Sequence, residues 1–190
     1  MRAIDEPRLE TDTAYRYEYL CEFIGFGPAD AAAIHGAAGV LAGQIGQIVE
    51  TTYAKLLAFD ATARHFVPRQ HGFAGDPPAS LEQLHQNHEQ IKFRKEHLLR
   101  YLMQMFGAPF NARTANYLDM VGKMHTPKAG NPAIDVPLVQ MNALMGLLSD
   151  ALLDVILQSQ LPPEKKSALA RAFNKLLWIQ NDLITRHYSP

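Results

Sequence analysis

Apolar side chains recur at three- and four-residue steps along most of the chain, the spacing that places them on one face of a helix. No stretch alternates apolar and polar residues as a strand does, so the sequence predicts an all-α fold. The expected helices cover residues 13–26, 29–59, 60–66, 80–106, 111–125, 138–160 and 163–187.

The segments between these helices carry loop signals. Residues 67–79 contain three prolines and two glycines, and residues 126–137 again combine proline with glycine. Ser80 and Gln83 form a capping-box pair, which predicts that a long helix begins at residue 80. Residues 1–13 are polar and lack a helical period, so we expect a flexible N-terminal lead before a single domain over residues 14–190.

Charge and cysteine content narrow the classes of partner and site. The 18 Lys and Arg and 19 Asp and Glu are scattered, so the chain favours neither nucleic acid nor an anionic membrane as a partner. No unbroken apolar run approaches the roughly 18 residues of a membrane span, and the N-terminus lacks the order of a signal peptide, so we expect a cytoplasmic protein. The single cysteine, Cys21, excludes an internal disulfide.

His125 stands out among the eight histidines. It closes a predicted helix just before a proline-containing loop and lies on the same face as Leu118 and Val121, so its ring is expected to point into the core. One ring nitrogen can then donate to a carbonyl one turn back, which leaves the other nitrogen free to bind a metal such as iron. A core histidine satisfied by a backbone carbonyl alone is the alternative.

Four segments resemble one known family. In QIGQIVETTYAKLLAFDATARHF (44–66), Tyr53 lies thirteen residues before Phe66; in NYLDMVGKMHTPKAG (116–130), Gly122 lies three residues before His125. Together with VPLVQMNAL (136–144) and FNKLLWIQNDL (173–183), they resemble the protoglobins and the sensor domains of globin-coupled sensors. The resemblance covers nearly the whole chain and implies a globin-like fold with an extra N-terminal helix preceding the first globin helix.

The resemblance also implies haem b and a set of roles. His125 would bind the haem iron on the proximal side, and Tyr53 would donate a hydrogen bond to bound dioxygen. The iron would be five-coordinate and would reversibly bind a diatomic gas (O2, CO or NO) for gas binding or sensing. The expected apolar haem wall consists of Phe66, Leu98, Leu102, Met124, Met141, Leu144 and Met145.

Two features depart from the family or stay open in the sequence. Thr52 precedes the distal tyrosine, where some protoglobins have a tryptophan, and the loop at 67–79 is longer than in the archaeal relatives. Three basic residues near the expected haem edge are candidates for pairing with propionates, although a solvated surface charge is the commoner role for each. These are Arg64, Arg69 and Lys128.

Other functions compete with haem binding. His85 and His88, with Glu82 and Glu89 nearby, have the spacing of a zinc pair, but no HExxH or CxxC accompanies them. A haem-free globin-fold module that dimerises through its last two helices is the alternative from a different class. Enzymatic function is not favoured, because no distal acid–base pair suits peroxide cleavage; peroxidase, nitrite or NO chemistry would be side reactions.

The final two helices are apolar over more than one narrow stripe, with Leu153, Leu176, Leu177 and Trp178 among the extra apolar positions. This predicts a homodimer held by a four-helix bundle, with a well-filled monomer core as the alternative. The sequence ends two residues after Tyr188, so sensing is expected to require a separate signalling partner.

Overall fold

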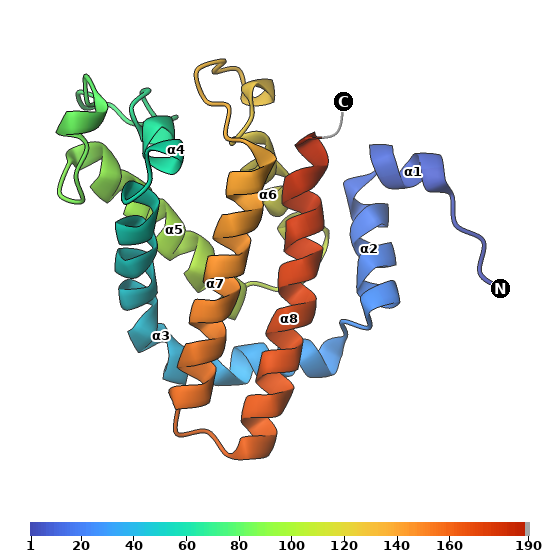
Figure 1. Ribbon diagram of the computed structural model, residues 1–190. Coiled ribbons are helices and arrows are strands. Elements are labelled where there is room, and N and C mark those ends of the chain that lie inside the picture. The colour runs from blue at the N-terminus through green and yellow to red at the C-terminus, as the bar shows by residue number, and fades with distance from the viewer. Residues whose placement is uncertain (189–190) are drawn as a thin grey trace.

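The computed structural model describes residues 1–188, in which every regular element is a helix (Figure 1). The α-helices are α1 (Glu6–Thr11), α2 (Thr13–Ile24), α3 (Pro28–Leu57), α4 (Asp60–Ala63), α5 (Glu89–Gly107), α6 (Ala112–Lys123), α7 (Leu138–Gln158) and α8 (Pro163–Thr185). Four short 3-10 helices lie between or after them: η1 (Arg64–Phe66), η2 (Leu81–Gln83), η3 (Pro127–Ala129) and η4 (Arg186–Tyr188).

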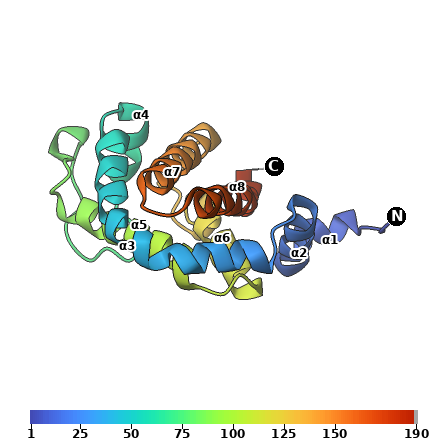
Figure 2. The ribbon, with the colours of Figure 1, turned by 90° about the horizontal axis from the view of Figure 1, so that it is seen from below.

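The helices pack in two crossed groups. The two longest C-terminal helices, α7 and α8, run antiparallel side by side, while α3 and α5 cross beside them (Figures 1 and 2). α3 begins beside α2, passes across one end of the α7–α8 pair and then turns along it (Figure 1). Gly36, Gly39, Gly43 and Gly46 lie in the middle of α3, where they lower the resistance of the helix to bending.

The core lies where these helices cross. Long aliphatic side chains from every major crossing helix are almost fully buried there, which supplies the main stabilising free energy of the fold. The largest of them are Ile34, Leu41, Ile45, Ile91, Leu102, Leu118, Leu152, Ile156, Leu169, Leu176, Ile179 and Leu183. The all-α fold predicted from periodicity is confirmed.

Two expected boundaries were wrong. The segment expected to be an irregular lead contains α1, whose first turn is capped by the Asp5 carboxylate, which accepts from the Arg8 N–H at 3.1 Å. The long helix α5 begins at Glu89 rather than at residue 80, because its N-cap is His88, whose Nδ1 accepts from the Gln90 N–H at 3.1 Å. The Gln83 side chain accepts from the Ala79 N–H instead of closing a capping box.

The α6–α8 crossing is unusually close at Gly122. A Cβ atom at that position would lie 2.6 Å from the Ile184 Cα and 2.8 Å from the Ile184 carbonyl carbon. Both neighbours are backbone atoms of α8, which cannot move away by changing a rotamer. Only glycine therefore fits here, three residues before His125.

Two helices, α3 and α7, are long and apolar enough on average to cross a membrane by length and composition. The core helices of a water-soluble protein meet the same criterion, and both helices place apolar residues in the core, among them Ile45 on α3 and Leu152 on α7. Two such helices are weak evidence for a membrane span.

Asp30 joins the start of α3 to α8. Its carboxylate accepts from the Gly27 N–H at 2.9 Å and pairs with Lys175 Nζ at 2.8 Å. Partial burial raises the pKa of this carboxyl group, but the bonds from Lys175 and Gly27 outweigh that effect and hold the pKa below its usual value.

A depressed pKa stabilises the fold above the carboxyl group's unfolded pKa of about 3.9, and this stability is lost as the pH falls through the folded pKa. We expect Asp30→Asn to lower the free energy of unfolding by about 1–3 kcal/mol at pH 7. Urea denaturation of both proteins at pH 7, 5 and 4 measures the difference, which should hold from pH 7 to 5 and begin to shrink near pH 4. A difference that grows towards acid pH would contradict this assignment.

Candidate functional site

A cavity of about 440 Å³ lies between α3, α5, α6 and α7. Its walls are mostly apolar, with methionines and leucines from α5, α6 and α7, and α8 contributes Ile184. A large, mainly apolar cavity with a few polar groups is the usual form of a small-molecule or cofactor site.

His125 lines this cavity directly after α6. Its Nδ1 lies 2.7 Å from the Val121 carbonyl oxygen, as predicted for a ring that donates one turn back. A carbonyl can only accept, so Nδ1 carries the proton and Nε2 keeps its lone pair. Burial, and to a smaller extent the charge of Arg94, lowers the pKa of His125 to about 4. The ring is therefore neutral at pH 7 and suited to bind a metal.

Tyr53 and Phe66 bring a second group of site residues to the same cavity. Tyr53 is 97% buried on α3, and its ring centroid lies 5.6 Å from that of Phe66 at the end of η1. Burial raises the pKa of the Tyr53 hydroxyl, and the charge and hydrogen bond of Arg94 oppose part of that rise. Tyr53 thus stays protonated at neutral pH and is a hydrogen-bond donor. Thr52, buried beside it, does not line the cavity.

Eight of the nine residues expected to surround a cofactor line this cavity. They are Tyr53, Phe66, Leu98, Met124, His125, Met141, Leu144 and Met145. The ninth, Leu102, is completely buried in the core one turn further along α5 and does not line the cavity. The cavity therefore brings together residues from five parts of the chain.

None of the three basic residues expected near the propionates lines the cavity, and two of them donate hydrogen bonds to backbone carbonyls. Arg69 donates to the Phe73 carbonyl at 3.2 Å and also to the Gly75 carbonyl, which closes its own loop. Lys128 Nζ donates to the His187 carbonyl oxygen at 2.9 Å. Arg64 is exposed and does not line the cavity.

The cations that do line the cavity were not singled out from the sequence. They are Arg94 and Arg100 on α5, with His65, His71 and His97 as further titratable groups. Arg94 follows Ile91 by three residues and precedes Leu98 by four, so it lies on the apolar face of α5. A charged residue on the apolar face of a helix is the sequence feature that could have identified Arg94 as a site residue.

A buried pair of glutamine side chains fixes the long loop against the cavity. Gln90 Oε1 accepts from the Gln70 N–H at 3.1 Å, and its Nε2 donates to the Phe66 and Pro68 carbonyl oxygens at 2.7 and 3.0 Å. Gln70 Nε2 in turn donates to the His65 carbonyl oxygen at 3.0 Å. These bonds hold Phe66 and Gln70 in the cavity wall, which gives the loop at 67–79 a structural role.

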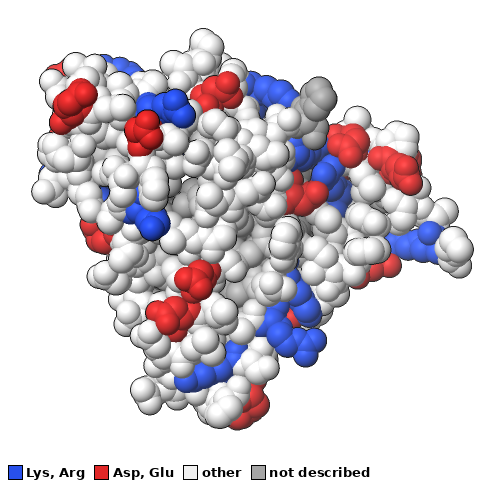
Figure 3. All heavy atoms as spheres, in the orientation of Figure 1, with Lys and Arg blue, Asp and Glu red and all other residues white. Residues whose placement is uncertain are grey.

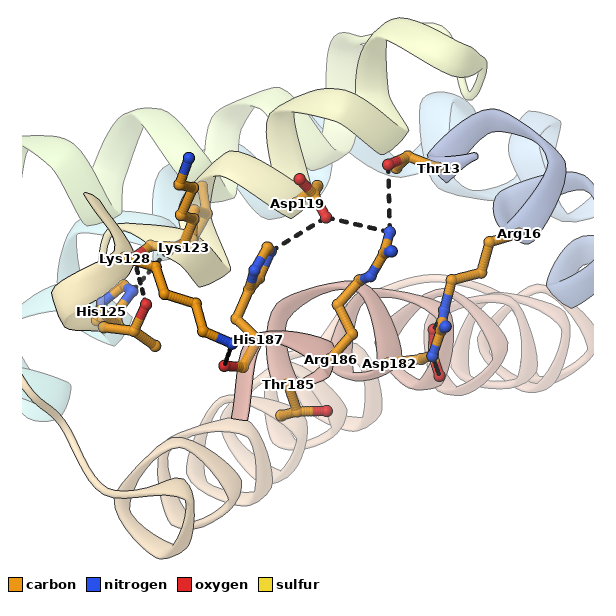
Figure 4. Close-up of polar contacts among 12 residues, drawn as sticks. Thr13, Arg16, Asp119, Lys123, His125, Lys128, Asp182, Thr185, Arg186 and His187 are labelled. Carbon is orange, nitrogen blue, oxygen red and sulfur yellow. Dashed lines mark hydrogen bonds and ion pairs between the residues drawn. The ribbon is translucent and has the colours of Figure 1, made fainter. Parts of the chain in front are cut away.

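Charged contacts anchor the helix that carries His125 (Figure 4). Asp119 on α6 accepts from His187 Nε2 at 3.1 Å and pairs with Arg186 at 3.3 Å, both in η4 directly after α8. Arg186 also donates to Thr13 at 3.2 Å, and Arg16 pairs with Asp182 at 2.6 Å. These contacts join α2, α6 and α8, and they fix α6, the helix that precedes His125.

The histidine pair proposed for zinc makes local contacts instead. His85 Nδ1 accepts from the Asn87 N–H at 3.2 Å, and His88 Nδ1 caps α5. Among residues 1–188, no three or more His, Cys, Asp or Glu side chains are grouped as a metal site would require.

The crossed helices and the histidine-lined cavity define an all-α protein of globin-like fold. A family model for protoglobin matches residues 13–190, so the chain belongs to the protoglobin family, as the sequence resemblance indicated. Protoglobins are globin-type gas-binding or sensing proteins that generally carry haem. No curated protein matches the chain.

Proposed function

We propose that the chain binds haem b in this cavity, with His125 as the proximal ligand of a five-coordinate iron, and reversibly binds a diatomic gas at the open position. The observation that carries the proposal is the neutral His125 ring, whose Nδ1 is engaged by Val121 and whose Nε2 keeps its lone pair beside an apolar cavity. Such a fixed, singly engaged imidazole is the arrangement found for metal-binding histidines.

The other cavity groups fit a planar, dianionic cofactor. Leucine, methionine and phenylalanine side chains suit the faces of the macrocycle, while Arg100 supplies a positive group for the propionates. No Asp or Glu among residues 1–188 lines the cavity, so no carboxylate there would repel these groups. Bound haem supplies an iron atom able to bind O2, CO or NO.

A haemin titration tests the proposal. Purified apoprotein is expected to bind one haemin per chain and to develop a strong Soret band, which shifts when the reduced protein is exposed to carbon monoxide. A protein of similar size without a haem site, such as lysozyme, controls for non-specific haemin uptake under the same conditions. A chain without a specific Soret band would sink the haem proposal and favour the haem-free interaction module.

Tyr53 is proposed to hold bound dioxygen. Its hydroxyl donates to the ligand, which carries partial negative charge, and a hydrogen bond to a charged group contributes about 1.5–3 kcal/mol. Tyr53→Phe keeps the ring against Phe66 and removes the donor. We expect its O2 dissociation rate, measured by stopped flow, to rise about ten- to a hundredfold. The CO dissociation rate is the internal control and should change little, since bound CO is less polar; equal changes for both gases would argue against the role.

We further propose a cytoplasmic homodimer formed through α7 and α8, which passes any gas signal to a separate partner. Most of the extra apolar side chains of these helices, including Leu176 and Leu177, are in the core, but Leu153, Leu157 and Trp178 remain 42%, 58% and 61% exposed. The area over the upper part of α7 and α8 lacks charged side chains, whereas acidic and basic side chains appear lower on these helices (Figure 3). Size-exclusion chromatography with light scattering distinguishes the dimer from a monomer of 21.2 kDa.

A further inference from the structure

Arg94 projects from α5 and lines the cavity together with Tyr53 and His125. Its guanidinium is close enough to the Tyr53 hydroxyl to lower the pKa of that group. Burial is the main cause of the altered pKa values of Tyr53 and His125, but the charge of Arg94 lowers both. The guanidinium is therefore close to the two residues that the haem proposal places on opposite sides of the iron.

The charge of Arg94 has no carboxylate partner among residues 1–188. Its Nε is buried without a hydrogen-bond partner, and none of the ion pairs in this part of the chain includes it. The next residue, Lys95, is different, because its Nζ pairs with Glu50 at 2.6 Å. Burying a cation without a counterion is costly, so this arrangement is expected to be satisfied by an anion from outside the chain.

Arg100 adds a second positive charge to the cavity wall, and the described part of the chain contributes no carboxylate to it. The nearest carboxylates identified by their electrostatic effects are Asp135 beside His65 and Glu96 beside His97, and neither lines the cavity. In a low-dielectric cavity, one fixed positive charge favours anionic ligands over neutral ones of similar size.

We propose that Arg94 and Tyr53 together form an anion-selective ligand site, which favours small inorganic anions bound to ferric haem over neutral ligands. This inference rests on the proposed haem site. Arg94 and Tyr53 would each donate a hydrogen bond to the bound anion. Losing the charged donor is expected to weaken anion binding about ten- to a hundredfold, the factor of one hydrogen bond to a charged group.

Azide is the probe, because it is anionic at pH 7 and its binding to ferric haem is followed in the Soret region. Four haemin-loaded proteins are compared: the wild type, Arg94→Met, Arg94→Lys and the control Arg64→Met, at an exposed arginine that does not line the cavity. Arg94→Met should raise the azide Kd about ten- to a hundredfold, Arg94→Lys should restore most of the affinity, and Arg64→Met should stay within about threefold of the wild type. The CO affinity of the ferrous proteins should change less than threefold in all four.

A measurement without haem gives an independent test. Arg94→Met removes a half-buried charge that lacks a carboxylate partner and whose Nε is buried without a hydrogen bond, so it should raise the Tm of the apoprotein, whereas Arg64→Met should leave it unchanged. An unchanged azide Kd in Arg94→Met, or an equal loss of azide and CO affinity, would overturn the inference. A loss of haemin affinity with unchanged azide preference would overturn it too, because Arg94 would then pair with a propionate.

The two proposals fail in different ways. If the wild type develops no specific Soret band, the haem proposal and the inference both fail. If the wild type binds haemin and CO as expected but Arg94→Met keeps its azide affinity, only the anion-selective site is lost.

Discussion

Replacing His125 by glycine is expected to weaken haemin binding on the order of a hundredfold, equivalent to about 2.7 kcal/mol. The substitution removes the imidazole whose Nδ1 donates to Val121 and whose Nε2 is free for the iron. It also leaves a space of the size of the lost ring beside the cavity. Added imidazole should enter that space and restore the Soret band of the wild type, which a merely structural effect of the substitution would not allow.

His97 provides the matched control for this experiment. It lines the same cavity from α5, but its ring packs edge-on against Phe93, with ring centroids 4.3 Å apart. His97→Gly removes the same group from the same cavity and should keep the Soret position and the CO spectrum of the wild type. Haemin titrations and circular dichroism of the three proteins provide the comparison. A His125→Gly protein with the wild-type Soret spectrum without imidazole would refute the proximal assignment.

Replacing Gly122 by alanine is expected to cost at least about 3 kcal/mol of unfolding free energy, at the upper end for overpacking. The added Cβ would meet the Ile184 backbone of α8, so relief requires separating two helices rather than turning one side chain. The same separation would displace His125 and weaken haemin binding. Urea denaturation of the apoprotein measures the first effect, and haemin titration measures the second.

Gly43 on α3 offers a control of the same chemical change. It is exposed, and a Cβ there would meet no atom within 4 Å. Alanine has the higher helix propensity, so Gly43→Ala is expected to stabilise the protein by about 0.5–1 kcal/mol. A Gly122→Ala protein as stable as the wild type would contradict the close contact between the α6 and α8 backbones.

The fold was predictable wherever one helix face repeats over many turns. α7 and α8 begin at the expected residues, Leu138 and Pro163, because proline precedes or starts each helix and long apolar stripes follow. The start of α5 is mispredicted because Ser80 and Gln83 have a capping signature, while the cap that forms is His88, whose Nδ1 accepts from the Gln90 N–H. Histidine is not among the residues that commonly mark a helix N-terminus in a sequence.

The candidate site was predictable where family spacing and helix faces agreed, as for Tyr53, Phe66 and His125. It was less predictable where a role depends on what faces a residue from another helix. The place of Arg94 on the apolar face of α5 is visible in the sequence, but the absence of a carboxylate from the cavity wall is visible only in the structure. Leu102 shows the reverse case, since its place on the stripe was right but it faces the core rather than the cavity.

The backbone contact between Gly122 and Ile184 has a mechanical consequence. Side chains between two helices normally absorb small displacements by changing rotamers, but here no side chain lies between them. A shift of α6 at the His125 end therefore moves the backbone of α8 with it. The single tryptophan of the chain, Trp178, lies exposed on α8, where its fluorescence would report that movement without an added label.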